Sequence, residues 1–177
     1  MRINLNLVDE LDIQPIAGYR FLPWSSNLLS EHAEAKYLSF CNEMDSHVFP
    51  CLGNSGGCLK LMNEISCRKG FAPKATWLVV TEQNFENYRP RENCGTVQGI
   101  VEKEDVGSIQ NLGIVPAHRG KGLGKQILIR SLIGFRSMGL ETVTLEVTSK
   151  NESALRLYEG IGFSIDEIVY KHADLRY

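Results

Sequence analysis

Three glycines at alternate positions, in the segment RGKGLG of residues 119–124, constrain the fold of this chain more than any other feature. The segment lies between an apolar, strand-like run that ends at Pro116 and a stretch with helical periodicity. Glycine adopts positive φ at little cost and has no Cβ, so successive backbone N–H groups can converge on one anion. The first turn of the following helix adds unpaired N–H groups and the positive end of its dipole. The sequence therefore predicts a strand–loop–helix unit suited to a pyrophosphate.

Two other glycine-rich phosphate motifs do not fit this segment. The P-loop needs a Lys-Ser or Lys-Thr pair after its last glycine, and no such pair follows Gly124. The dinucleotide-binding motif has a different glycine order and an early first strand, whereas this loop lies two-thirds of the way along the chain. A loop whose glycines serve only its own geometry stays open at this point.

The rest of the chain predicts a mixed α/β class. Strands are expected at 19–22, 76–81, 96–102, 108–115, 142–147 and 163–170, and helices from Ser25 or Ser26 to Ser39, at 59–66, 122–138 and 152–159. The turn-rich segment 48–57 is expected to be a loop. Adjacent strands imply antiparallel pairing, and the strand–helix–strand segment 109–147 implies one parallel crossover. We expect a single domain over 1–177, with helices in 18–70 and the binding core in 75–170.

Composition excludes several classes of partner. The net charge of −2 gives no general attraction to nucleic acid or anionic lipid. The chain has no apolar run of about 18 residues. Acids at Asp9, Glu10 and Asp12 stand where a signal peptide would need an apolar run. We therefore expect a cytoplasmic protein with neither a nucleic-acid nor a membrane partner.

The five cysteines are an odd number without tight pairing. In a cytoplasmic protein the default is reduced thiols, several of them buried. Cys51, Cys58 and Cys67 follow His47, but their gaps of seven and nine residues match no common zinc-ligand spacing. No metal site is predicted.

Two motifs within residues 109–163 resemble the GCN5-related N-acetyltransferase (GNAT) superfamily. In that family a strand leads through a proline into an (Arg/Gln)-x-x-Gly-x-(Gly/Ala) turn, as Pro116 leads here into residues 119–124. A helix and a strand later comes Asn-x-x-Ala-x-x-x-Tyr-x-x-x-Gly-Phe, matched here from Asn151 to Phe163. The resemblance covers residues 75–170 well. It implies an α+β fold: a mostly antiparallel twisted sheet, helices on both faces and a central, splayed pair of parallel strands.

The resemblance also implies roles for particular residues. Acetyl-CoA would be the acyl donor, with its pantetheine arm on the backbone of β-strand residues near Gly113, its pyrophosphate on the loop, and a hydrogen bond from Asn151. The cofactor-binding residues would be Leu112, Gly113, Ile114, Arg119, Gly120, Lys121, Gly122, Leu123, Gly124, Lys125 and Asn151. Tyr158 would protonate the leaving thiolate, which a phenol with a pKa of about 10 can do. The alternative for Tyr158 is a core tyrosine packed beside Ala154 and Ile161.

The general base is not fixed by the resemblance. Many members carry a Glu where this chain has Gln110, and a Gln side chain cannot take a proton. Glu146, on the Thr142/Thr144 face of the next expected strand, is the candidate base, and Glu102 and Glu104 are other candidates. A water chain to bulk solvent is a further possibility.

The acceptor is predicted to be an amine, preferably on a small molecule. Specificity would come from the early helices and the loops 45–58 and 82–94, where aromatic side chains either line a pocket or pack in the core. Open alternatives are a protein (N-terminal or lysine) acetyltransferase, a catalytically silent acyl-CoA sensor, and a protein that binds ATP or NAD through the same loop. Edge strands make a homodimer plausible.

Overall fold

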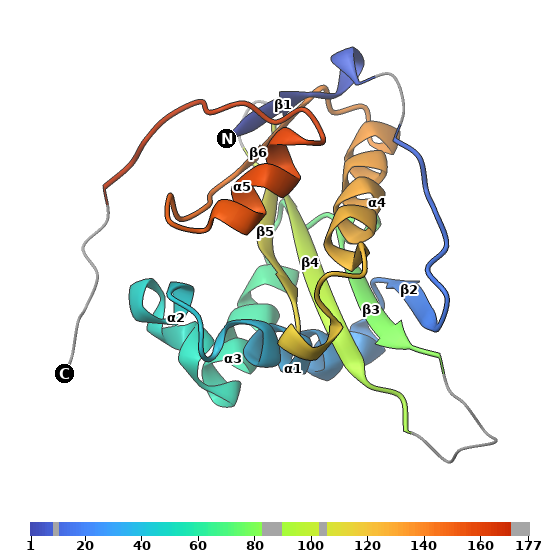
Figure 1. Ribbon diagram of the computed structural model, residues 1–177, viewed down its shortest axis with the longest axis vertical. Coiled ribbons are helices and arrows are strands. Elements are labelled where there is room, and N and C mark those ends of the chain that lie inside the picture. The colour runs from blue at the N-terminus through green and yellow to red at the C-terminus, as the bar shows by residue number, and fades with distance from the viewer. Residues whose placement is uncertain (9–10, 83–89, 103–105, 171–177) are drawn as a thin grey trace.

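The computed structural model describes residues 1–8, 11–82, 90–102 and 106–170, which form one sheet with helices on both faces (Figure 1). Within these ranges the strands are β1 (Arg2–Asn4), β2 (Tyr19–Pro23), β3 (Trp77–Thr81), β4 (Asn93–Val101), β5 (Val106–Ile114) and β6 (Thr142–Leu145). Their order is β1-β6-β5-β4-β3-β2, and each neighbouring pair is antiparallel except β5 and β6. The expected mixed sheet with one parallel pair is confirmed.

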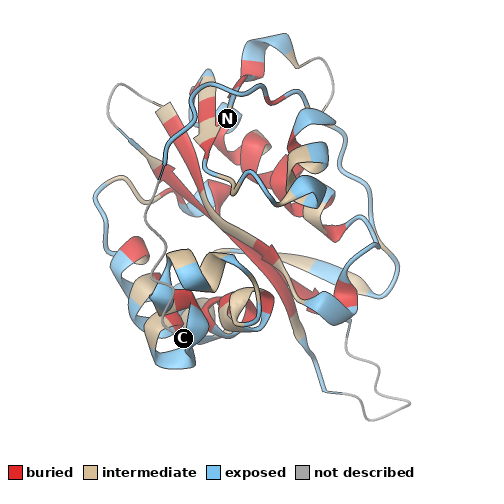
Figure 2. Ribbon diagram, turned by 60° about the vertical axis from the view of Figure 1, so that its left-hand side comes forward, coloured by how far each residue is buried: buried red, intermediate tan, exposed pale blue. Residues whose placement is uncertain are grey.

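The helices divide between the two faces of the sheet. They are α1 (Leu29–Phe40), α2 (Asp45–Val48), α3 (Ser55–Ser66), α4 (Leu123–Ser137) and α5 (Glu152–Glu159), with single 3₁₀ turns between several elements. On one face, Ala35 of α1 packs against Leu78 and Val80 of β3. On the other, α4 and α5 cover a larger core that includes Val79 of the same strand. Because successive strand residues point to opposite faces, the consecutive buried residues Leu78, Val79 and Val80 mean that β3 is buried on both sides. Figure 2 shows the central strands of the sheet largely in the colour of buried residues.

The C-terminal half of helix α4 packs directly against the backbone of the 3₁₀ turn Pro73–Ala75, which precedes β3. A Cβ added at Gly134 would lie 2.1 Å from the carbonyl oxygen of Lys74, so only glycine fits there. Ser131, one turn earlier, donates a hydrogen bond of 2.7 Å to the carbonyl oxygen of Ala75. These contacts fix the axis of α4, and therefore the position of its N-terminus.

The expected closing strand at 163–170 is wrong. Of that segment, Ser164 alone pairs with a strand, through two 2.9 Å backbone hydrogen bonds with Arg2, and residues 165–170 are exposed. The place beside β6 is taken by β1 from the N-terminus, which pairs over Arg2–Asn4. Three residues are too few for periodicity to reveal a strand, and this is why the prediction missed it.

The segment 48–57 is more helical than expected. It contains α2's last residue, a 3₁₀ turn at Pro50–Gly53 and the start of α3 at Ser55, where Asn54 caps the helix by accepting from the Gly57 N–H at 2.6 Å. The other predicted elements are found with ends shifted by a few residues. Across the described ranges, no helix is long and apolar enough to cross a membrane, and no three metal-ligating side chains gather.

Candidate functional site

The parallel strands β5 and β6 pair over only four positions. Pairing runs from Val106 opposite Thr142 to Ile109 opposite Leu145, after which β6 ends and β5 continues to Ile114. Asn111 has a positive φ of 48°, at the point where the β4–β5 register also shifts. Asn tolerates this conformation better than most residues. Beyond Ile109 the β6-facing edge of β5 therefore has no strand partner among the described residues, and its backbone groups are available to an extended ligand.

Residues 119–124, the glycine loop, follow directly on this open edge. Gly120 and Gly122 have φ values of 75° and 82°, and the first hydrogen bond into α4 runs from the Gln126 N–H to the Gly122 carbonyl oxygen at 3.1 Å. Within the described part of the chain, no backbone N–H from Gly120 to Lys125 has a hydrogen-bond acceptor. Six consecutive donors at a helix N-terminus suit a large anion.

The side chain of Arg119 is turned away from these donors. Its guanidinium donates to the carbonyl oxygen of Ile114 at 2.9 Å, to that of Ser39 at 3.1 Å and to the carboxylate of Glu43 at 2.7 Å. The residue thus holds the end of α1 against the end of β5, and its charge is paired with Glu43. The predicted role of Arg119 in cofactor binding would therefore depend on its position beside the glycine loop and not on the charge of its guanidinium.

Lys121 belongs to a hydrogen-bond chain that sequence reasoning missed. Its ammonium donates to the Tyr19 hydroxyl at 2.6 Å, Tyr19 lies 2.9 Å from His118 Nδ1, and His118 Nε2 lies 3.1 Å from a carboxylate oxygen of Glu92. Because an ammonium only donates, the Tyr19 O–H is left to donate to His118 Nδ1, and Nε2 carries the proton shared with Glu92. Tyr19 and Glu92 are far in sequence from His118 and Lys121, so no local pattern could reveal these hydrogen bonds.

The end of β5 meets the glycine loop and α5. A Cβ at Gly124 would lie 3.4 Å from Leu157 and 3.7 Å from Ile114. A Cβ at Gly113 would lie 2.7 Å from atoms of Phe40 and Ser39, so α1 covers that point of the strand directly. Of the predicted cofactor-binding residues, Ile114 at the end of β5 is thereby brought next to Gly124 at the start of α4.

Asn151 caps α5 rather than standing free. Its Oδ1 accepts from the Ala154 N–H at 3.2 Å and from the Ser153 hydroxyl at 3.1 Å. Among the described residues the side-chain nitrogen of Asn151 donates no hydrogen bond, so both of its N–H groups are available to a ligand.

Tyr158 is buried, with 6% of its surface exposed, and its ring lies 5.9 Å from that of Phe163. No hydrogen-bond partner for its hydroxyl is found among the described residues. Burial, with a smaller effect from the negative charge of Asp45, raises the pKa of Tyr158 to about 12. The hydroxyl is therefore protonated over the whole ordinary pH range and can act as a proton donor.

The acidic candidates are distributed unevenly about the open edge. Glu146 follows Leu145, where the pairing of β6 with β5 ends, and Gln110 follows Ile109 at the same end of the pairing. Gln110 donates to the Ser108 hydroxyl at 2.8 Å, and Glu146 is exposed. Glu102 lies at the β4–β5 turn, at the opposite end of β5 from Ile114. Glu104 and most of the loop 82–94 lie outside the described residues.

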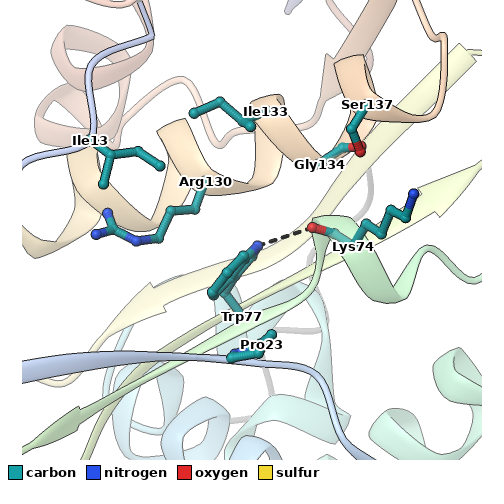
Figure 3. A pocket seen from close by; sticks show the side chains of 8 residues that line it. All are labelled: Ile13, Pro23, Lys74, Trp77, Arg130, Ile133, Gly134 and Ser137. Atoms are coloured by element: carbon teal, nitrogen blue, oxygen red, sulfur yellow. Dashed lines mark hydrogen bonds between the residues drawn. The ribbon is translucent and has the colours of Figure 1, made fainter.

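A separate hollow lies against the C-terminal half of α4 (Figure 3). Its lining residues are Ile13, Pro23, Lys74, Trp77, Arg130, Ile133, Gly134 and Ser137. The Trp77 indole donates to the Lys74 carbonyl oxygen at 3.1 Å, and Arg130 stacks 3.9 Å from the centroid of the Phe21 ring. At 1.5 Å per helical residue, Ile133 is roughly 15 Å from Leu123 at the helix start, so this hollow is not part of the glycine-loop site.

Sequence comparisons agree with this geometry. Residues 63–163, more than half of the chain, match the sequence model of the acetyltransferase (GNAT) family. Over 65 residues the chain is 40% identical to a mycothiol acetyltransferase of Mycobacteroides abscessus, a match that covers 37% of this chain. It covers only 22% of that relative's length.

Solved structures share the fold at low sequence identity. The ribosomal-protein-S18-alanine N-acetyltransferase from Escherichia coli aligns with a TM-score of 0.61 and 16% identity, over 84% of this chain and 79% of that one. An aminoglycoside N-acetyltransferase, AAC(6')-Iy, in complex with CoA aligns with a TM-score of 0.63 and 11% identity, over 89% and 95%.

Proposed function

The chain belongs to the acetyltransferase (GNAT) family, and from that premise we propose that it transfers an acetyl group from acetyl-CoA to a primary amine. The observation that carries the proposal is the run of six backbone N–H groups from Gly120 to Lys125 that have no acceptor among the described residues, placed at the end of a strand edge that no described strand pairs with. A pyrophosphate needs such a group of donors, and an extended pantetheine arm needs such an edge.

In the proposed mechanism the glycine loop holds the pyrophosphate and β5 holds the pantetheine arm, near Leu112, Gly113 and Ile114. The amine nitrogen attacks the acyl carbon directly, a carbon–nitrogen bond forms and the carbon–sulfur bond breaks. Tyr158 gives its proton to the departing thiolate, and the amine gives up a proton to a base. The products are the amide and CoA thiol, so atoms and charge balance.

We assign the base to Glu146. It follows Leu145, the last residue of β6 that pairs with β5, just as Gln110 follows the partner residue Ile109. A carboxylate at this end of the pairing would take the role that a Glu at the position of Gln110 has in many members. The alternative is a catalytically silent module that binds acyl-CoA, which the amide of Gln110 favours.

The acceptor we propose is a small-molecule amine. The names of the mycothiol acetyltransferase and of the aminoglycoside acetyltransferase support this class, whereas the alanine N-acetyltransferase keeps a protein amine as the alternative. We further propose a cytoplasmic location, because the five cysteines of the described residues are all unpaired thiols. A homodimer through an exposed sheet edge is compatible with the fold.

The test combines a binding and a turnover measurement. Calorimetry with CoA should show specific binding, and release of CoA thiol from acetyl-CoA should require an added amine from a broad panel. Tyr158→Phe should lower kcat by about 10²-fold or more while CoA affinity is kept. Tyr170→Phe is the matched control, since Tyr170 is 94% exposed. An unchanged kcat in Tyr158→Phe would remove Tyr158 as the acid, and CoA binding without any turnover would favour the silent module.

A further inference from the structure

Asp45 connects the early helices to the open side of the sheet. It is the first residue of α2, between α1 and α3, and its Oδ1 accepts a hydrogen bond of 2.8 Å from the Thr148 hydroxyl. Thr148 lies three residues after Leu145, the last residue of β6 that pairs with β5. Figure 1 shows α2 below α5 and the segment that leads into it. The Asp45 carboxylate is thus held against the segment that runs from the end of β6 to α5.

The same carboxylate is tied to the start of the helix that carries the proposed acid. The carbonyl oxygen of Thr148 accepts a hydrogen bond of 2.8 Å from the Asn151 N–H, and Asn151 caps α5, which contains Tyr158. The negative charge of Asp45 also contributes to the raised pKa of Tyr158, after the larger effect of burial. Asp45 is half-buried, and this limits the screening of its charge by water, so a positively charged group near this end of α5 would be attracted to it.

The other acids of this region are already engaged. Glu43 forms an ion pair with Arg119 at 2.7 Å, Glu31 one with Arg91 at 3.4 Å, and Glu34 accepts from the Asn93 amide at 2.8 Å. Asp45, like Glu34, has a neutral hydrogen-bond partner, and no Lys, Arg or His of the described residues forms an ion pair with it; unlike Glu34, it is bonded to the segment that leads into α5. A half-buried carboxylate with a neutral partner keeps its capacity for a cation.

We propose that Asp45 binds the acceptor as an ammonium ion beside the thioester, and so selects amines that are protonated over alcohols and weakly basic amines. The proposal rests on the proposed function and deepens it, because it names the chemical state in which the acceptor arrives. Glu146 then takes the proton that must leave before attack and releases it to solvent, so that it can take the second proton, which the nitrogen loses as the amide forms. Gln110 contributes no charge to this binding.

Two substitutions separate the charge of Asp45 from its structural bond. Asp45→Asn keeps an oxygen that can accept from Thr148 but removes the charge. Thr148→Val removes the hydrogen bond and keeps the charge. With Asp45→Asn, kcat/KM for primary alkylamines should fall about tenfold or more, mainly through the KM for the amine. The KM for acetyl-CoA and the melting temperature should stay as in the wild type.

The amine panel supplies the decisive contrast. Alkylamines are protonated at neutral pH, whereas methoxyamine is largely neutral, so Asp45→Asn should affect methoxyamine far less. An equal loss for both probes, or the same loss in Thr148→Val, would overturn the proposal and leave Asp45 with a structural role only.

Binding of the same amines to the CoA-saturated protein, measured by calorimetry, makes the result independent of turnover. Alkylamine binding that needs Asp45 but leads to no transfer would support the ammonium site while refuting the proposed enzyme function. Acetyl transfer that proceeds equally well in Asp45→Asn would support the proposed enzyme function and refute the ammonium site. Failure of any alkylamine to bind the CoA-saturated wild type would also overturn the ammonium site.

Discussion

Replacing Gly122 with Asp should weaken CoA binding about 100-fold or more while leaving the fold intact. A side chain at this position has room, because the nearest atom to an added Cβ is Ile16 Cδ1 at 3.8 Å. The positive φ of 82° costs a residue with a Cβ roughly 1 kcal/mol, and Asp and Asn tolerate it best. For a domain of this size, that loss lowers the melting temperature by about 2–4 °C.

The effect on binding should be much larger than the effect on stability. Two unit charges about 5 Å apart, at an effective dielectric constant of about 20, repel by about 3 kcal/mol. A loss of that size weakens CoA binding about 100-fold. The pyrophosphate carries more than one charge, so this figure is a lower bound before screening by salt.

Gly122→Asn is the control that isolates the charge. It has the same shape and the same backbone strain as Gly122→Asp, but it carries no charge. Isothermal titration with CoA, on both variants and at two salt concentrations, measures the difference. Equal CoA affinity in the two variants would refute the assignment of the glycine loop as the anion site.

Three further predictions concern the buried polar groups and the packing of α4. Burial lowers the pKa of Lys36 from 10.5 to about 8, so the folded protein loses stability as the pH falls through that range. Lys36→Met removes this penalty and should raise the free energy of unfolding at pH 7, measured by urea titration, by an amount on the order of 3 kcal/mol. Burial and the charge of Lys36 lower the pKa of His32 from 6.5 to about 3, so the folded protein loses stability as the pH falls through this window. In His32→Gln the melting temperature should fall less steeply with decreasing pH over that window. An unchanged dependence of melting temperature on pH would contradict this prediction. Gly134→Ala should destabilise by roughly 2 kcal/mol or more, since its Cβ would meet the Lys74 carbonyl oxygen at 2.1 Å, and a loss under about 0.5 kcal/mol would be at odds with the close packing of α4.

The glycine loop and the elements on either side of it could be predicted from the sequence, because the residues that specify them are close together in the chain. Alternate glycines after Pro116 and before an amphipathic segment indicate a strand, a turn and a helix, and the structure has these elements in order. The helix predicted at 152–159 has those bounds in the structure, since Asn151 caps it and Gly160 follows its last residue.

Long-range pairing could not be predicted in the same way. Residues 2–4, and not residues 163–170, form the strand beside β6. Which segment pairs there depends on which one the fold brings to the edge of the sheet, and the residue pattern of a segment does not reveal this. The ties of Arg119 to Glu43 and of Asp45 to Thr148 join residues that are 76 and 103 positions apart. Such contacts follow from the fold, so sequence spacing gave no sign of them.

The central claim, that the glycine loop and the open edge of β5 bind CoA, is tested most directly by thermal stability in the presence of acetyl-CoA, CoA, ATP or NAD. A ligand at 100 times its Kd adds about 2.7 kcal/mol, which raises the melting temperature of a domain of this size by about 5–10 °C. We predict that rise with acetyl-CoA and CoA in the wild type, at most about 2 °C at the same concentrations in Gly122→Asp, and little with ATP or NAD. Equal shifts with NAD, or no shift with either form of CoA, would contradict the account.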